Sequence, residues 1–195
     1  MKLLIIFFVR LSLISVWIGG AMAQNSIELG LESKHKIGFA TGFGLKEKYN
    51  YQVYFFQIEY YRTLYSGKTM NLEIIFQPQY NTTELSYSAE SQNILKGHEF
   101  GVNMGVLLRK YIIKGVLNTY ISFSSGPHYV SKALPHQADG FIFSDNLLVG
   151  INIKIETGVY LDVRTGFRHI SNAGLKSPNR GINNYVLTSG LIVQL

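Results

Sequence analysis

Hydrophobic and polar positions alternate with a period of two along most of the chain after residue 35. Successive side chains of a β-strand point to opposite faces, so this alternation predicts strands with one apolar face and one face of small or polar residues. The stretch 37–45 shows it clearly. Its apolar or β-branched positions are Ile37, Phe39, Thr41, Phe43 and Leu45, and glycine or alanine lies between them.

Eight such segments are separated by turn residues. They cover residues 36–45, 50–65, 69–80, 98–110, 116–126, 142–155, 157–170 and 182–195, and the stretch 26–34 either extends the first strand or precedes it. After the N-terminal segment, no hydrophobic run approaches the roughly 18 residues that a membrane helix needs. The sequence therefore predicts an all-β fold, an eight-stranded antiparallel barrel.

Two kinds of barrel fit this alternation, because the apolar face can turn inward or outward. A soluble, lipocalin-like binding barrel has an apolar interior, whereas a transmembrane β-barrel faces lipid with its apolar side. Short connections alternate with longer ones except at 46–49, which is short where the pattern requires a longer loop, and the last strand ends at the C-terminus, as in outer-membrane barrels. Tyrosines near strand ends suggest interfacial girdles: Tyr49, Tyr51, Tyr65, Tyr80, Tyr111 and Tyr185. We therefore predict the transmembrane form.

An eight-stranded barrel has an interior filled by side chains, so it is not a pore. Isolated charges would be costly there, and we expect the charged residues of the polar faces to pair with one another. These residues are Glu59, Glu73, Arg109, Asp162, Arg164 and Arg168.

The first 23 residues have the features of a secretory signal peptide. Lys2 precedes an apolar run, and Ala21-Met22-Ala23 is a suitable cleavage site. Residues 24–195 are then expected to form a single exported domain in the outer membrane.

Composition excludes several kinds of chemistry. The chain has no cysteine, so it has no disulfide framework, thiol nucleophile or thiolate metal site. The net charge of +6 is mildly basic, but lysine and arginine are scattered and do not suggest nucleic-acid binding. Four histidines lack metal-ligand spacing and are expected at solvated loops or rims: His35, His98, His128 and His136. We predict no metal or cofactor.

One constellation suggests catalysis. In the stretch 167–184, which reads FRHISNAGLKSPNRGINN, His169 and Ser171 share a face with the apolar residues of the seventh predicted strand if that strand continues to Ser171. A serine hydroxyl is a weak nucleophile and needs an adjacent base, most often histidine. The pair is thus expected on the lipid-facing side, at the loop end of the barrel.

The same stretch resembles the outer-membrane lipid A 3-O-deacylases, the PagL family. The matching residues are His169-Ile-Ser171-Asn172-Ala173-Gly174-Leu175-Lys176, then Pro178-Asn179 and Gly181-Ile182. The resemblance implies a serine nucleophile, Ser171, with His169 as general base. It also implies an oxyanion hole formed by the Gly174 backbone N–H and the Asn179 side chain, with Asn172 in a supporting role.

The chain departs from this family at the third member of the triad. The glutamate of the family falls on Asn183, which shares the outer face with His169. An asparagine can orient an imidazole but cannot stabilise imidazolium by charge. Three possibilities follow. Asn183 orients a slower dyad, or the protein is impaired, or an acid from elsewhere serves: Glu99, Asp139 or Asp145.

The sequence thus predicts an outer-membrane esterase that removes an ester-linked acyl chain from lipid A of lipopolysaccharide. The resemblance places cleavage at the 3-position, where the chain is a 3-hydroxyacyl group. With periplasmic termini, the site would face the outer leaflet. The alternatives are a non-catalytic barrel, either adhesin or structural, and the soluble lipocalin-like barrel.

Overall fold

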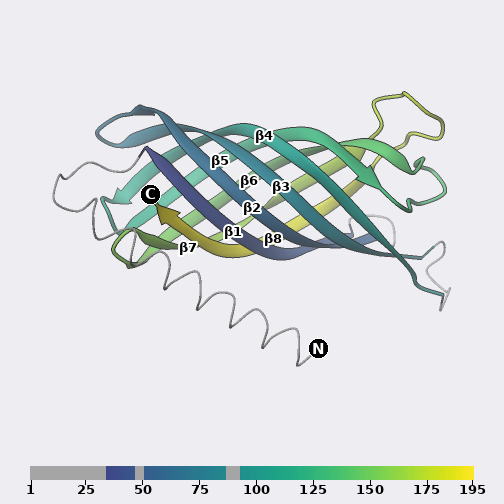
Figure 1. Cartoon of the computed structure of the whole chain (residues 1–195), viewed down its shortest axis with the longest axis horizontal. Helices are drawn as coiled ribbons and strands as arrows, with labels where there is room; N and C mark the ends of the chain where they lie inside the picture. Colours follow the sequence, from purple (N-terminus) through teal and green to yellow (C-terminus); the bar gives the residue numbers. More distant parts are fainter. Residues whose placement is uncertain (1–33, 47–50, 87–92) are drawn as a thin grey trace.

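The protein is a closed eight-stranded antiparallel β-barrel, in which each strand pairs with its sequence neighbours and β1 closes the sheet against β8 (Figure 1). The computed structural model describes residues 34–46, 51–86 and 93–195. The strands are β1 (His35–Lys46), β2 (Tyr51–Ser66), β3 (Met70–Leu85), β4 (Leu95–Ile113), β5 (Leu117–Val130), β6 (Gly140–Glu156), β7 (Val159–Ser171) and β8 (Ile182–Gln194). The predicted fold class is confirmed, while the proposed signal peptide lies outside the described residues.

The strands differ most from their predicted ranges at the end of the barrel that carries the longer loops, which we call the loop end. β3 and β4 continue their pairing as far as Leu85 and Leu95, and β5 continues to Val130. These extensions pass through polar residues that resemble loop sequence but keep the ladder hydrogen-bonded. Among the described residues, no helix is long and apolar enough to cross a membrane.

The apolar faces of the strands point outward. On β6, for example, Leu147, Val149 and Ile151 are 52%, 50% and 42% exposed, while Leu148 between them is 6% exposed. Soluble monomers rarely expose apolar patches larger than a few hundred Å². Here exposed large apolar residues lie on the outer faces of seven of the eight strands, and those of β7 are partly exposed. The lipocalin-like alternative is wrong, because a soluble barrel would not expose an apolar outer surface of this extent.

The interior contains buried polar and charged side chains beside two apolar clusters, and its charges are paired as predicted. Glu73 binds both Lys36 and Arg109, with nitrogen–oxygen distances of 2.6 and 2.9 Å. Further along the barrel, ion pairs join Arg164 to Glu59 and Arg168 to Glu99. Charges removed from water are tolerated when such pairing and further hydrogen bonds compensate them. The side chains therefore fill the barrel, as its small size requires.

Two expectations about individual residues are wrong. Tyr51 is not at the membrane interface, because its side chain is buried inside the barrel and donates a hydrogen bond to Glu99. His128 is not a solvated rim residue, because β5 continues past it and turns it inward, within 3.2 Å of Gln79 and Asn103. Tyr49 lies outside the described residues.

The two ends of the barrel differ in their connections. Residues 67–69, 114–116 and 157–158 are short turns at one end, which is also where β8 ends. At the other end, residues 131–139 and 172–181 form longer loops, seen in green and yellow (Figure 1). These two loops pack together: Ala138 N donates to Pro178 O at 2.7 Å, and Arg180 N to His136 O at 3.0 Å.

Candidate active site

His169 and Ser171 end β7 at the loop end of the barrel, on its outer face. The neighbouring residues Arg168 and Ile170 are fully buried inside, whereas His169 and Ser171 are partly exposed. Positions two apart on a strand are separated by roughly 6.6 Å along the chain and lie on one face. The structure thus places the predicted pair side by side, directed away from the interior.

A row of polar side chains crosses the outer face at the level of His169. Strand register aligns Ser125 of β5 with Asp145 of β6, Asp145 with His169, and His169 with Asn183 of β8. We call these four residues the polar row. The neighbouring row toward the turn end is apolar or aromatic: Phe123, Leu147, Phe167 and Tyr185. Polar groups are uncommon on an otherwise apolar lipid-facing surface, so the polar row is a candidate functional site.

Asn183 contacts the histidine directly. Its Oδ1 lies 2.6 Å from Nδ1 of His169. An amide oxygen only accepts hydrogen bonds, so Nδ1 carries the proton and donates it. This tautomer leaves Nε2 with its lone pair free to accept a proton, which is the state that a general base requires.

Strand register and burial separate the three acids considered as charged partners of His169. Glu99 is buried inside the barrel, 2.6 Å from Arg168, on the wrong side of the sheet. Asp139 lies in the 131–139 loop, exposed and 3.4 Å from Lys176. Asp145 lies on the outer face directly across from His169, and its Oδ1 accepts a hydrogen bond from Ser125 at 2.6 Å.

The loop after Ser171 is organised by Asn172, which is buried. Its Nδ2 donates to Lys176 O at 2.7 Å, and its Oδ1 accepts from Gly174 N at 3.0 Å. The Asn172 backbone N–H donates to Asn179 Oδ1 at 2.9 Å. This bond fixes the Asn179 amide so that its Nδ2 remains a donor. The Gly174 N–H, predicted as an oxyanion donor, is bound to Asn172 within the loop.

Residues that the sequence did not indicate hold this loop in place. Gln137, which is 2% exposed, accepts a hydrogen bond from Gly181 N at 2.9 Å, and its backbone bridges to Asn179. Nothing in the sequence identifies this contact, because it joins two loops distant in sequence. Burial and then the charge of Arg180 lower the pKa of His136 in the same loop contact, so His136 is neutral at pH 7.

Gly181 is required for two reasons. Its φ of 71° lies in the left-handed region, and a Cβ there would overlap the His169 ring. Gly181→Ala is therefore expected to lower the free energy of unfolding by about 1–2 kcal/mol from backbone strain, and further from the overlap. Gly115→Ala is the matched control, since Gly115 has a φ of 74° with no atom near its Cβ position. Equal losses in urea titrations would contradict the contact with His169.

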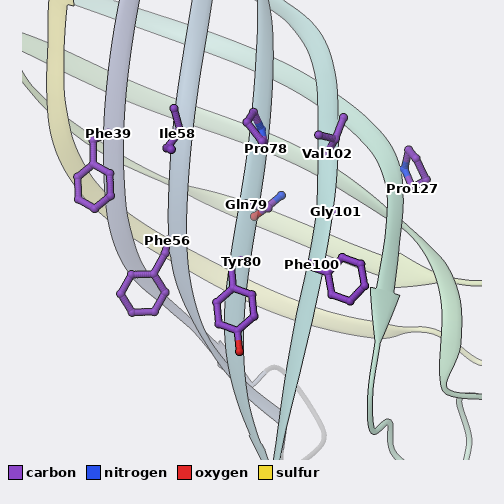
Figure 2. Close-up of a pocket in the computed structure, with 10 residues that line it drawn as sticks. All are labelled: Phe39, Phe56, Ile58, Pro78, Gln79, Tyr80, Phe100, Gly101, Val102 and Pro127. Carbon is purple, nitrogen blue, oxygen red and sulfur yellow. The ribbon is translucent and has the colours of Figure 1, made fainter.

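The outer face also carries a hollow that no residue of the polar row lines. This hollow of about 670 Å³ lies on the outer face of β1 to β5, lined mainly by apolar side chains including Phe39, Tyr80 and Phe100 (Figure 2). It contains neither His169 nor Ser171. Within residues 34–46, 51–86 and 93–195, no group of three or more His, Cys, Asp or Glu could hold a metal ion.

The family model for lipid A 3-O-deacylase (PagL) matches residues 51–191, which include β7, its following loop and most of β8. No curated protein matches the chain.

Among solved structures, the crystal structure of the outer membrane enzyme PagL has a TM-score of 0.62 at 19% identity, covering 78% of this chain and 97% of that one. Neisserial surface protein A (NspA) has a TM-score of 0.50 at 13% identity, covering 83% and 96%. These structures share the barrel fold. Because the family model spans more than half of the chain, the chain belongs to the lipid A 3-O-deacylase (PagL) family of outer-membrane proteins.

Proposed function

We propose that the protein hydrolyses the 3-O-linked 3-hydroxyacyl ester of lipid A, with Ser171 as nucleophile and His169 as general base. The observation that carries this proposal is the polar row, which aligns His169 with a hydrogen-bonded Asn183 on a face that otherwise contacts lipid. Family membership supports the substrate class. A non-catalytic adhesin or structural barrel would gain nothing from this row.

The reaction divides into two steps. Nε2 of His169 takes the proton of the Ser171 hydroxyl as Oγ attacks the ester carbonyl carbon, and it then gives the proton to the departing sugar oxygen. The acyl chain is left on Ser171. A water molecule, deprotonated by His169, attacks the acyl carbon, releases the 3-hydroxy fatty acid and restores the Ser171 hydroxyl.

The tetrahedral intermediate of each step carries a negative oxygen that needs donors. We assign this role to Asn179 Nδ2 and the Gly174 N–H. The bond from Asn172 N to Asn179 Oδ1 supports the first assignment, because it leaves Nδ2 unused by that contact. The Gly174 N–H would share or exchange its Asn172 acceptor for the oxyanion. Loss of one such donor typically lowers the rate about 10²- to 10³-fold.

The site would face the outer leaflet of the outer membrane. Short turns of outer-membrane barrels are periplasmic and longer loops are extracellular, so β7 runs outward and ends at the outer surface. His169 and Ser171 would then lie at the depth where acyl chains join the lipid A sugars. The substrate would reach them from the surrounding leaflet, without entering the barrel.

Asn183→Ala tests the orienting role of the asparagine. Without the Oδ1 acceptor, the His169 ring loses its fixed tautomer, and we expect kcat to fall about 10- to 100-fold. The control is Ser189→Ala, which lies on the outer face of β8 nearer the turn end and should leave kcat unchanged. An Asn183→Ala variant as active as the parent would exclude the role.

The proposal is tested with the purified protein in detergent micelles and lipid A of known structure. Released fatty acids are identified by gas chromatography and mass spectrometry. We expect one 3-hydroxy fatty acid and a lipid A product lacking one primary ester-linked chain. Absence of hydrolysis, or release of only the secondary acyl chains, would refute the assignment.

A further inference from the structure

Asp145 is the acid closest in register to His169 on the described outer face of the barrel. It belongs to β6, faces outward between two buried residues, Ser144 and Asn146, and pairs across the sheet with His169. Directly opposed residues of antiparallel strands have Cβ atoms about 4.5–5.5 Å apart, which is close enough for a carboxylate to act on an imidazolium through its field. The position of Asp145 across from His169 is set by the register of β6 with its neighbours β5 and β7.

No cation of the described residues forms an ion pair with Asp145. Its Oδ1 accepts a hydrogen bond from Ser125, which keeps the carboxylate on the outer face. A carboxylate at a lipid-facing position is costly unless a positive charge compensates it, at least during part of the reaction.

We propose that Asp145 supplies the negative charge that stabilises His169 when it becomes imidazolium, the charge that Asn183 cannot supply. This inference rests on the proposed function of His169 as general base. Asn183 on β8 accepts a hydrogen bond from Nδ1 and sets the tautomer of His169. Asp145 lies on β6, on the other side of β7, and acts on His169 through its electrostatic field. Two residues on β6 and β8 thus divide the work that a single carboxylate does in a Ser-His-Asp triad.

No other ionisable group in the described part of the chain duplicates this position. On β7 the remaining charged residues, Asp162, Arg164 and Arg168, point into the barrel. β8 presents Tyr185 near His169, and its ring lies against Phe167. From the 131–139 and 172–181 loops, Asp139 and Lys176 pair with each other, and the other ionisable residues are Lys132, His136 and Arg180.

Asp145→Asn tests the inference, because it keeps the shape and removes the charge. We expect kcat/KM for lipid A hydrolysis to fall about 10- to 100-fold, less than the roughly 10⁴-fold that follows loss of a directly bonded triad carboxylate. A nearby carboxylate favours the protonated form of a histidine, so its removal favours the neutral form. The acid limb of the kcat/KM profile, which reports neutral His169, should therefore move to lower pH.

Asp145→Glu keeps the charge and should keep the acid limb in place. Asn183→Glu brings a carboxylate to His169 from β8. Combined with Asp145→Asn, it should restore most of the lost activity, and alone in the parent it should raise activity far less. The charge-matched control is Glu156→Gln, at the turn end of the same strand, which should change neither rate nor profile. Folding of each variant is measured by its heat-modifiable migration in gels. If Asp145→Asn does not fold, Asp145→Ser is used in its place.

The outcomes separate this inference from the proposed function. An Asp145→Asn variant with the parent's rate, or with a reduced rate but an unmoved acid limb, overturns the role of Asp145 alone, provided that Ser171→Ala is inactive. Hydrolysis that persists in Ser171→Ala overturns the proposed function and this inference together.

Discussion

Ser171→Ala is expected to abolish lipid A hydrolysis. Without the hydroxyl no acyl-serine forms, and removal of a catalytic serine from a comparable site lowers kcat about 10⁶-fold. We therefore expect activity below detection in the micelle assay, with unchanged folding, because Ser171 lies on the outer face and fills no part of the interior.

The control for this variant is Ser189→Ala, a serine on the outer face of the adjacent strand β8. It should retain full activity, since Ser189 donates to the backbone oxygen of Asp162 at 3.0 Å, away from the site. If Ser171→Ala keeps even a tenth of the parent's rate, attack by a serine is not the mechanism.

Glu73→Ala is expected to lower the free energy of unfolding more than any other variant proposed for this protein. It leaves Lys36 and Arg109 facing each other inside the barrel, where Glu73 now binds them at 2.6 and 2.9 Å. Breaking a buried ion pair by removing one partner typically costs about 3–5 kcal/mol, because the remaining charge is uncompensated. Urea titration of the protein folded into micelles measures the free energy of unfolding.

Glu84→Ala is the matched control, because Glu84 is on the outer face of the same strand and only partly buried. It should change the free energy of unfolding by less than about 1 kcal/mol. Similar losses for Glu73→Ala and Glu84→Ala would mean that the interior network does not stabilise the barrel.

Much of the fold was predictable because the sequence of a strand distinguishes its two faces. The outward apolar residues and the paired inner charges follow from alternation and from the cost of isolated charges. Tyr51 is a residue for which two signals conflict. It shares parity with Glu59 on β2 and therefore lies inside, although its place near a strand end suggested an interfacial girdle.

His128 shows a second limit, which is the position of strand ends. Ser122, Ser124 and His128 lie on one face of β5, but the sequence around Gly126 and Pro127 resembles a turn. The ladder with β6 continues through these residues, and it turns His128 inward.

The candidate site was only partly accessible to sequence reasoning. The shared face of His169 and Ser171 needs no tertiary information, because the two residues belong to one strand. The choice of Asp145 over Glu99 and Asp139 needs the register between β6 and β7. The bond from Gly181 to Gln137 needs the packing of two loops, which no local pattern records.

Mass spectrometry of lipid A from intact Gram-negative cells tests the central claim most directly. Cells that express the protein should contain lipid A lighter by one 3-hydroxyacyl chain, and cells that express Ser171→Ala should contain the unmodified form. Lipid A of unchanged mass in the presence of folded parent protein, or the same loss of mass with both proteins, would contradict the account.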